Sequence, residues 1–329
     1  MNLPLTDSVG RSHTYLRVSV TDRCNYRCLY CMPEEGLQWM PKADILQFEE
    51  IARIVRIMAG MGIQKIRITG GEPTIRADIG ELIQAISEIP GIQDVAMTTN
   101  AHTLAKLASP LAKAGLDRVN ISLDSLDPQR FAELTRGGNL QRVLNGIHAA
   151  REAGLTPIKI NAVLLDGVNE HEVYNLVEYF SSDASTTELR FIEYMPFEVR
   201  RYNTVPAERL RTMLRKRWEL IPEQNQSMTA GPARYMTVKE TGLKVGFISP
   251  LSEHFCASCN RLRLQANGHL RTCLAHEDTP SLRDLLRKGF SDDQIEESIR
   301  NMVLGKPIGH DCAITDGTLF EGVMTAVGG

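Results

Sequence analysis

The sequence has no excess of charge of either sign and few aromatic residues. Its formal net charge is −3, and aromatic residues make up 6%. A charge this close to zero provides no general attraction for nucleic acid or for an anionic membrane surface, so an anion-binding site has to be local. We therefore expect neither nucleic acid nor a membrane as a partner. Hydrophobic residues make up 43% and charged residues 23%, which is typical of a soluble globular protein.

Long apolar runs are also missing. The richest stretch, residues 51–63, is interrupted by Arg53 and Arg56. Nowhere does an uncharged run approach the ~20 residues of a membrane-spanning helix. The N-terminal residues contain no apolar core of the length found in signal peptides. We expect a cytoplasmic location.

Cysteine is scarce, and its placement is informative. Seven cysteines in 329 residues are too few for a scaffold held by disulfides. Grouped thiols in a reducing compartment favour metal chemistry instead. Only Cys312 stands apart, and we interpret it as a lone buried thiol. The other six form two groups of three, which are Cys24, Cys28, Cys31 and Cys256, Cys259, Cys273.

Strand-like and helix-like patterns alternate from residue 15 to about residue 196. Repeated strand–helix units predict a parallel sheet with right-handed crossovers. Six units are found where a complete barrel has eight. We therefore predict an α/β fold, namely a partial, six-stranded TIM-type (β/α) barrel, with a doubly wound open sheet as the alternative. The predicted strands cover 15–21, 65–69, 94–99, 118–124, 158–164 and 188–195, and the predicted helix N-caps are Thr103, Asn139 and Asn169.

The composition changes at residues 223–232, a polar stretch that predicts a linker. Beyond it, residues 235–238 and 243–248 are typical of a β-hairpin. We therefore divide the chain into a barrel, residues 1–222, and a small C-terminal α+β extension, residues 233–329, which carries the second cysteine group.

Polar and apolar residues alternate along the predicted strands, whereas a parallel sheet covered on both faces has continuous apolar runs. Because successive side chains point to opposite faces, the apolar face meets the helices and the polar face lines the barrel interior. An antiparallel sheet with one wet face is the alternative. Cations gathered in such an interior are unfavourable unless an anion joins them, and a nucleotide phosphate is the natural candidate. The cations in question are Arg17, Lys65, Arg67 and Lys159.

The first cysteine group directly follows the first predicted strand, at the end where barrel enzymes place their chemistry. Three close thiolates suit an iron–sulfur cluster or zinc, and three ligands leave one metal position open for catalysis. For the second group zinc stays open, because a histidine could complete four ligands; the candidates are His254, His269 and His276. Arg261 and Arg263 would be useful beside a phosphate-bearing substrate.

The spacing C-x3-C-x2-C, with Tyr30 before the last cysteine, resembles the signature of the radical S-adenosylmethionine superfamily. Gly70-Gly71-Glu72-Pro73 is similar to the GGEP motif of that superfamily. Together with these, the second cysteine group, the terminal Gly328-Gly329 and several short motifs resemble the GTP 3′,8-cyclase family. Those motifs lie at residues 21–25, 67–73, 98–100, 120–124 and 190–193.

The resemblance implies radical cyclisation of GTP to 3′,8-cyclo-7,8-dihydro-GTP, the first step of molybdenum cofactor biosynthesis. It implies two 4Fe–4S clusters and S-adenosylmethionine, with the second cluster facing the guanine base. It also implies a single-electron donor of the flavodoxin or ferredoxin type, a downstream cyclic pyranopterin monophosphate synthase and a homodimer. The alternatives are a radical enzyme that modifies peptides and a non-enzymatic electron-transfer or zinc-stabilised binding protein.

The resemblance also assigns roles to individual residues. Cys24, Cys28 and Cys31 hold the first cluster and Cys256, Cys259 and Cys273 the second. Tyr30, Gly71, Thr98, Ser122, Lys159 and Met195 match positions that contact S-adenosylmethionine. Arg17, Lys65, Arg67, Arg190, Arg261 and Arg263 match positions that bind GTP, and Arg17, Arg67, Arg190, Arg263, Gly328 and Gly329 match catalytic positions. No counterpart is found for residues 310–320.

Overall fold

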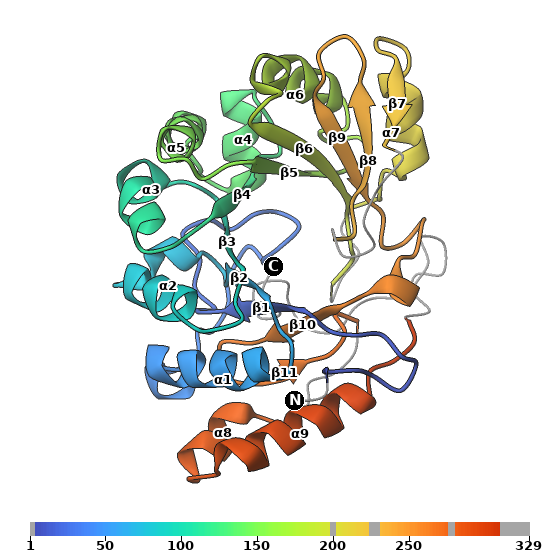
Figure 1. The fold of residues 1–329 in the computed structure, drawn as a ribbon. Coiled ribbons are helices and arrows are strands. Elements are labelled where there is room, and N and C mark those ends of the chain that lie inside the picture. Colours follow the sequence, from blue (N-terminus) through green and yellow to red (C-terminus); the bar gives the residue numbers. More distant parts are fainter. Residues whose placement is uncertain (1–3, 198–201, 224–230, 276–279, 310–329) are drawn as a thin grey trace.

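A computed structural model describes residues 4–197, 202–223, 231–275 and 280–309 (Figure 1). In these residues, one curved eleven-stranded sheet has the order β11-β10-β1-β2-β3-β4-β5-β6-β9-β8-β7. The strands are β1 (Tyr15–Ser19), β2 (Lys65–Thr69), β3 (Asp94–Thr99), β4 (Arg118–Ser122), β5 (Ile158–Leu164), β6 (Thr187–Glu193), β7 (Leu220–Pro222), β8 (Arg234–Val238), β9 (Lys244–Ile248), β10 (Arg261–Leu264) and β11 (Leu270–Arg271). The helices are α1 (Phe48–Gly60), α2 (Ile79–Ser87), α3 (Leu104–Lys113), α4 (Pro128–Thr135), α5 (Leu140–Glu152), α6 (Glu172–Phe180), α7 (Ala207–Leu214), α8 (Leu282–Arg287) and α9 (Asp292–Leu304).

The six strands β1 to β6 are parallel neighbours, with helices on the outer face of the curved sheet (Figure 1). This confirms the partial barrel and excludes the antiparallel alternative. The C-terminal extension lengthens the barrel at both edges, because β10 pairs in parallel with β1 and β9 pairs in parallel with β6. The predicted hairpin is confirmed as the antiparallel pair β8–β9. No helix among the described residues is long and apolar enough to cross a membrane.

Three strands differ in length from the prediction. β1 and β4 end at Ser19 and Ser122, and β6 covers Thr187–Glu193 instead of 188–195. Beyond Ser19 the chain leaves the sheet. There the carbonyl of Thr21 accepts a hydrogen bond from Gly71 N, in the loop that follows β2. The alternating polar residues at the strand ends therefore belong to loops that form the site.

The helix α1 buries one apolar stripe against the sheet. Ile51, Ile54, Val55 and Met58 of α1 are all fully buried in the core. α1 begins with a capping box at Gln47, which fixes where the helix starts. The hydrophobic core thus lies between the helices and the apolar face of the sheet, which leaves the polar face for the interior of the barrel.

Of the three predicted N-caps, Asn139 is confirmed, since its side chain accepts a hydrogen bond from Arg142 N at the start of α5. Thr103 occupies the N-cap position of α3, but its hydroxyl makes no capping bond and donates to Thr74 instead. A cap needs the side-chain oxygen to accept a hydrogen bond from an N–H of the first turn, but Thr103 has near-helical backbone angles (φ −107°, ψ −3°) instead of the extended ones typical of a cap.

The prediction for Asn169 is wrong, because α6 begins after His171. Asn169 is fully buried, and its amide donates to the carbonyl oxygens of Asp124 and Val163. Its side chain therefore joins the ends of β4 and β5, a tertiary role that sequence spacing does not distinguish from a cap.

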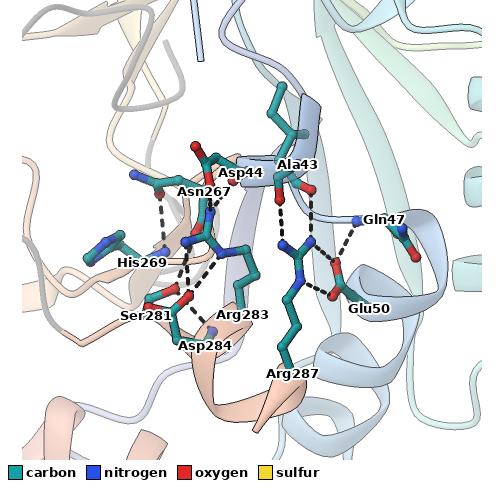
Figure 2. Close-up of polar contacts among 11 residues, drawn as sticks. Ala43, Asp44, Gln47, Glu50, Asn267, His269, Ser281, Arg283, Asp284 and Arg287 are labelled. Atoms are coloured by element: carbon teal, nitrogen blue, oxygen red, sulfur yellow. Dashed lines mark hydrogen bonds and ion pairs between the residues drawn. The ribbon is translucent and has the colours of Figure 1, made fainter. Parts of the chain in front are cut away.

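Two arginines of α8 hold this helix against α1 and the loop before α1 (Figure 2). Arg287 Nε lies 2.7 Å from a carboxylate oxygen of Glu50, and its guanidinium also donates to the carbonyl of Ala43. Arg283 donates to the carbonyl of Asp44. The C-terminal extension is therefore held on the barrel by charge-assisted hydrogen bonds at this surface.

We expect Arg287→Ala to lower the free energy of unfolding by about 1 kcal/mol, because charged hydrogen bonds to Glu50 and Ala43 are lost from a side chain that is partly exposed. Chemical denaturation of the apoprotein measures this. The control is Arg215→Ala, which removes a surface pair with Glu208 only and should change stability by less than ~0.5 kcal/mol. Equal effects of the two variants would contradict the conclusion that Arg287 helps to hold the C-terminal extension on the barrel.

Candidate active site

The concave face of the sheet encloses a cavity of about 370 Å³, a size typical of small-molecule sites. Its walls include polar side chains from β1, β2, β4, β5 and β6, which confirms the predicted polar lining. The cavity is also lined by all six cysteines of the two groups. One enclosed space therefore brings together segments from both ends of the chain.

Most of the predicted site residues lie on the wall of this cavity, whereas Lys65, the half-buried first residue of β2, is not among the lining residues. Gly328, Gly329, Cys312 and residues 310–320 lie outside the described residues. Besides the six cysteines, the predicted residues on the wall are Arg17, Arg67, Arg190, Arg261, Arg263, Tyr30, Gly71, Thr98, Ser122, Lys159 and Met195.

The GGEP turn packs directly on the chain that leads to Cys24. Gly71 N donates to the Thr21 carbonyl, and Glu72 N donates to the Arg23 carbonyl, both at 2.8 Å. A Cβ at Gly71 would lie 2.2 Å from the Arg23 carbonyl oxygen. Only glycine allows this approach, so the motif fixes the position of the first cysteine loop.

Glu72 is a site residue that the sequence reasoning missed. It is almost fully buried and accepts hydrogen bonds from Thr99 Oγ1 at 2.6 Å and from Asn100 N at 2.7 Å. Burial raises the pKa of Glu72, while these hydrogen bonds oppose the shift. The Asn100 amide in turn lies 3.9 Å from Cys24 Sγ. Glu72 therefore ties the end of β3 to the cysteine loop.

The three thiols of the first cysteine group lie in surroundings where their thiolate forms need a cation to balance the charge. Burial raises the pKa of Cys24 to about 11 and that of Cys31 to about 12. Burial and the neighbouring Cys31 raise the pKa of Cys28 well above its ordinary value. Three thiolates cannot share this site unless positive charge joins them, and the irons of an iron–sulfur cluster supply that charge. This donor set fits a 4Fe–4S cluster with one iron left for another ligand.

Tyr30 lies on the cavity wall and is anchored there by a hydrogen bond from its phenol hydroxyl. Its hydroxyl donates to Asp124 Oδ2 at 2.7 Å, and Asp124 Oδ1 accepts from Val163 N at 2.8 Å. Burial raises the pKa of Asp124 to about 6, although both hydrogen bonds oppose this. Asp124 ends the motif at residues 120–124, for which the sequence predicted no role of this carboxylate. In the structure it holds Tyr30 against β5.

Arginines from neighbouring strands are in register on one wall of the cavity. Arg17 of β1 pairs with Arg67 on one side and with Arg263 on the other. Burial lowers the pKa of Arg17 to about 10, and Arg67 and Arg261 contribute to this shift by repulsion. Burial together with Arg17 and Arg261 also lowers the pKa of Arg263. This wall is therefore poised to accept an anion.

Buried polar atoms on the wall support the same conclusion. Among the described residues, Nε and one terminal nitrogen of Arg67, and Nε of Arg190, have no hydrogen-bond partner. The same holds for Thr98 Oγ1, Asn120 Oδ1 and Asn161 Oδ1. Since buried polar groups are nearly always paired, this set of donors and acceptors fits a polar ligand that carries negative charge.

Lys159 differs from the arginines because a carboxylate already faces it. Its ammonium lies 2.7 Å from Glu188 Oε2, which also accepts a hydrogen bond from the Tyr235 hydroxyl. Burial lowers the pKa of Lys159, and Glu188 opposes this shift. Lys159 is therefore held in place on the cavity wall by the strand next to it.

Two cations lie beside Cys259 of the second cysteine group. Arg261 and Lys306 place their nitrogens 3.7 and 3.8 Å from Cys259 Sγ. Burial alone would raise the pKa of Cys259, but Arg261 and Lys306 lower it to about 6. His254 and His269 are not among the lining residues of the cavity, and His276 lies outside the described residues.

Neither cysteine group is arranged around a single ion. Among the described residues, no three Cys, His, Asp or Glu side chains form a set that would hold one metal ion.

Glu193, at the end of β6, is another residue whose role was missed. Its carboxylate accepts hydrogen bonds from the backbone of Leu251 and Ser252, each at 3.1 Å. A third comes from Ala207 N. It thereby fixes the loop that precedes the second cysteine group to the barrel.

Two family models match the chain in succession. The radical SAM superfamily model covers residues 18–180, and the Molybdenum Cofactor Synthesis C model covers residues 187–312. These matches meet before the predicted linker at 223–232, and the division at that linker stays a prediction.

Curated relatives agree with these models. GTP 3′,8-cyclase of Paracoccus denitrificans is 45% identical over 94% of this chain and 90% of the relative. The enzyme of that name from Hydrogenovibrio crunogenus is 42% identical over 94% of both chains. Molybdenum cofactor biosynthesis protein 1 of Bos taurus is 42% identical over 88% of this chain, which spans 46% of that longer protein.

Among solved structures, Streptococcus suis SuiB bound to S-adenosylmethionine has a TM-score of 0.59 and 21% identity, over 88% of this chain and 68% of SuiB. This likeness shows the fold. The fold, the two cysteine groups on one cavity and the identity to the curated relatives lead to one conclusion: the chain belongs to the GTP 3′,8-cyclase family of the radical S-adenosylmethionine superfamily.

Proposed function

We propose that this chain catalyses the radical cyclisation of GTP to 3′,8-cyclo-7,8-dihydro-GTP with S-adenosylmethionine, the first step of molybdenum cofactor biosynthesis. The observation that carries the proposal is one cavity whose wall holds both cysteine groups and six arginines, including the five that the resemblance predicts. A cofactor that cleaves S-adenosylmethionine and a site for a polyanionic nucleotide are then adjacent, as the reaction requires.

The cysteines would hold two 4Fe–4S clusters, one on Cys24, Cys28 and Cys31 and one on Cys256, Cys259 and Cys273. When bound, the first cluster supplies the electron that breaks S-adenosylmethionine into methionine and a 5′-deoxyadenosyl radical. The chain's own contribution is to position the reactants, because a radical in a water-filled site would be lost to side reactions.

The arginines are suited to the triphosphate. Arginine offers a planar fork of donors that matches phosphate oxygens, and its charge persists at any physiological pH. In this cavity Arg17, Arg67 and Arg263 stand side by side on adjacent strands, and Arg190 and Arg261 complete the set. A bound triphosphate would relieve the repulsion among them, so substrate binding and charge balance favour each other.

The remaining wall would bind S-adenosylmethionine. We assign this role to Tyr30, Gly71, Thr98, Ser122, Lys159 and Met195, all of which line the cavity. Thr98 Oγ1 is a buried hydroxyl with no hydrogen-bond partner among the described residues, so it has a proton to donate to a carboxylate and lone pairs for an ammonium group.

Product analysis tests the proposal. The anaerobically reconstituted protein, with about eight irons per chain for two clusters, is incubated with GTP, S-adenosylmethionine and a reductant. A product with the mass of GTP is expected, with an altered nucleoside fragment, together with methionine and 5′-deoxyadenosine. ATP in place of GTP is the control and should give no cyclic product. Cleavage of S-adenosylmethionine without any change to GTP would overturn the proposal.

Family membership supports further proposals about partners. We propose that a flavodoxin or ferredoxin supplies the electron, that a cyclic pyranopterin monophosphate synthase consumes the product, and that the chain works as a homodimer in the cytoplasm. Sedimentation of the reconstituted protein would measure the oligomeric state directly.

We propose that the last two residues take part in catalysis. Removal of Gly328 and Gly329 should lower the rate of cyclisation by at least about tenfold, equivalent to ~1.4 kcal/mol of transition-state stabilisation, while iron content stays unchanged. Product formation and iron content are both measured. Full activity of the truncated protein would contradict a catalytic role for Gly328 and Gly329.

A further inference from the structure

A buried lysine stands beside the second cysteine group. Lys306 follows α9 and is only 4% exposed. Its ammonium donates to the carbonyl of Arg261 at 2.7 Å and lies 3.8 Å from Cys259 Sγ. The ammonium thus contacts both the ligand loop and a ligand atom.

Charged groups of the second cysteine group and of the N-terminal segment act on Lys306. Among the described residues, Lys306 takes part in no ion pair with Asp or Glu. Arg11 and Arg261 repel its ammonium, Cys259 and Cys273 attract it as thiolates, and the imidazole of His13 also interacts with it. A buried ammonium needs compensating charge. In this environment the thiolates of the second cysteine group provide it.

A second arginine holds the segment of Lys306 in place. Arg11 donates to the carbonyls of Cys256 at 2.9 Å and of Pro307 at 2.7 Å, and its Nε pairs with buried Asp7 at 2.6 Å. The N-terminal segment therefore ties the backbone of one cysteine to the backbone next to Lys306. These contacts fix the backbone next to Lys306, so its ammonium has a defined position beside Cys259.

We propose that Lys306 is a positioning residue for the second cluster: it braces the loop of Cys259 through the Arg261 carbonyl and places a positive charge on the Cys259 sulfur. The inference rests on the proposed function, because it concerns the cluster that this cysteine group would hold. A cation that donates to a ligand sulfur stabilises the reduced cluster, which carries one more negative charge, so it raises the reduction potential.

The test is a redox titration of the reconstituted holoenzyme without GTP, followed by electron paramagnetic resonance. Lys306→Met should make one-electron reduction of the second cluster at least tenfold less favourable, which corresponds to a potential about 59 mV more negative. The signal of the first cluster, identified by its response to S-adenosylmethionine, should not move. Lys306→Gln, which keeps a donor but not the charge, should show the same shift, and Lys306→Arg should restore the potential.

A matched control is Lys239→Met, which removes an exposed lysine paired with Glu219 and should change neither potential. An unchanged potential in both neutral variants would overturn the inference, and so would a Lys306→Arg variant that behaves like Lys306→Met. If Lys306→Met does not assemble the second cluster, the iron content of Lys306→Arg decides: about eight irons support the inference and about four overturn it. Because GTP is absent from the titration, a failure of GTP cyclisation is distinguishable from a failure of this inference.

Discussion

Replacing Cys28 by alanine should reduce the formation of 5′-deoxyadenosine to the level of the apoprotein. Cys28 is half-buried beside the other two thiols of the first group, and the three thiolates together would hold a 4Fe–4S cluster with one iron left for another ligand. With two ligands left, no site-differentiated cluster can be held, and no electron reaches S-adenosylmethionine. Chromatography of the nucleosides after anaerobic incubation with a reductant measures the loss.

The matched control is Cys273→Ala in the second group. This variant should keep the cleavage of S-adenosylmethionine, because the first cluster is intact, while losing cyclisation of GTP. The two variants therefore separate the radical source from the substrate site. Formation of 5′-deoxyadenosine by Cys28→Ala at the wild-type rate would show that the first group has been assigned wrongly.

Adding a methyl group at Gly71 should also impair the first cluster and the cleavage of S-adenosylmethionine, although Gly71 is not a cluster ligand. The new Cβ would meet the Arg23 carbonyl oxygen at 2.2 Å and the Asp22 carbonyl oxygen at 2.7 Å, so the backbone before Cys24 would have to move. Overpacking of this kind costs about 1–3 kcal/mol, which corresponds to roughly a fivefold to 150-fold change in an equilibrium, and a 2.2 Å contact lies toward the upper end. We expect Gly71→Ala to lower iron uptake by the first group and formation of 5′-deoxyadenosine at least tenfold.

Gly80→Ala is the control for this substitution. Gly80 lies in α2, and its nearest neighbour to an added Cβ is the far end of Leu111 at 4.0 Å. The added methyl group meets no clash there and should leave iron content and activity unchanged, with equal or higher stability. A Gly71→Ala protein with a normal first cluster would mean that the close approach of the two loops is not needed.

Alternation along the strands was enough to predict which wall of the sheet holds the cations. Arg17 and Arg67 follow from local spacing, because a strand places every second side chain on the same face. Arg190 needed the family resemblance, since Ile192 interrupts the run of polar residues on its face of the strand, which begins with Glu188. The pairing of Arg17 with Arg263 was beyond local reasoning, because it depends on β10 joining β1 from far along the chain.

The residues that the sequence analysis missed share a physical reason. Glu72 and Glu193 are buried carboxylates whose partners come from other strands and loops, and Asn169 imitates a helix cap in sequence but joins two strands in space. A one-dimensional pattern records which residue types follow one another. It does not record which backbone N–H groups need an acceptor once the strands are packed.

The placement of β10 and β9 at opposite edges of the barrel affects how the chain can be made. During synthesis the N-terminal strands emerge long before the strands that cover their free edges, so β1 and β6 stay unpaired on one side until the last third of the chain is available. Unpaired edges promote association with other chains, and distant pairing slows folding. Both free edges of the six-stranded barrel are thus covered only when β9 and β10 pair, and we expect a chain truncated before residue 244 to aggregate more readily than the full chain.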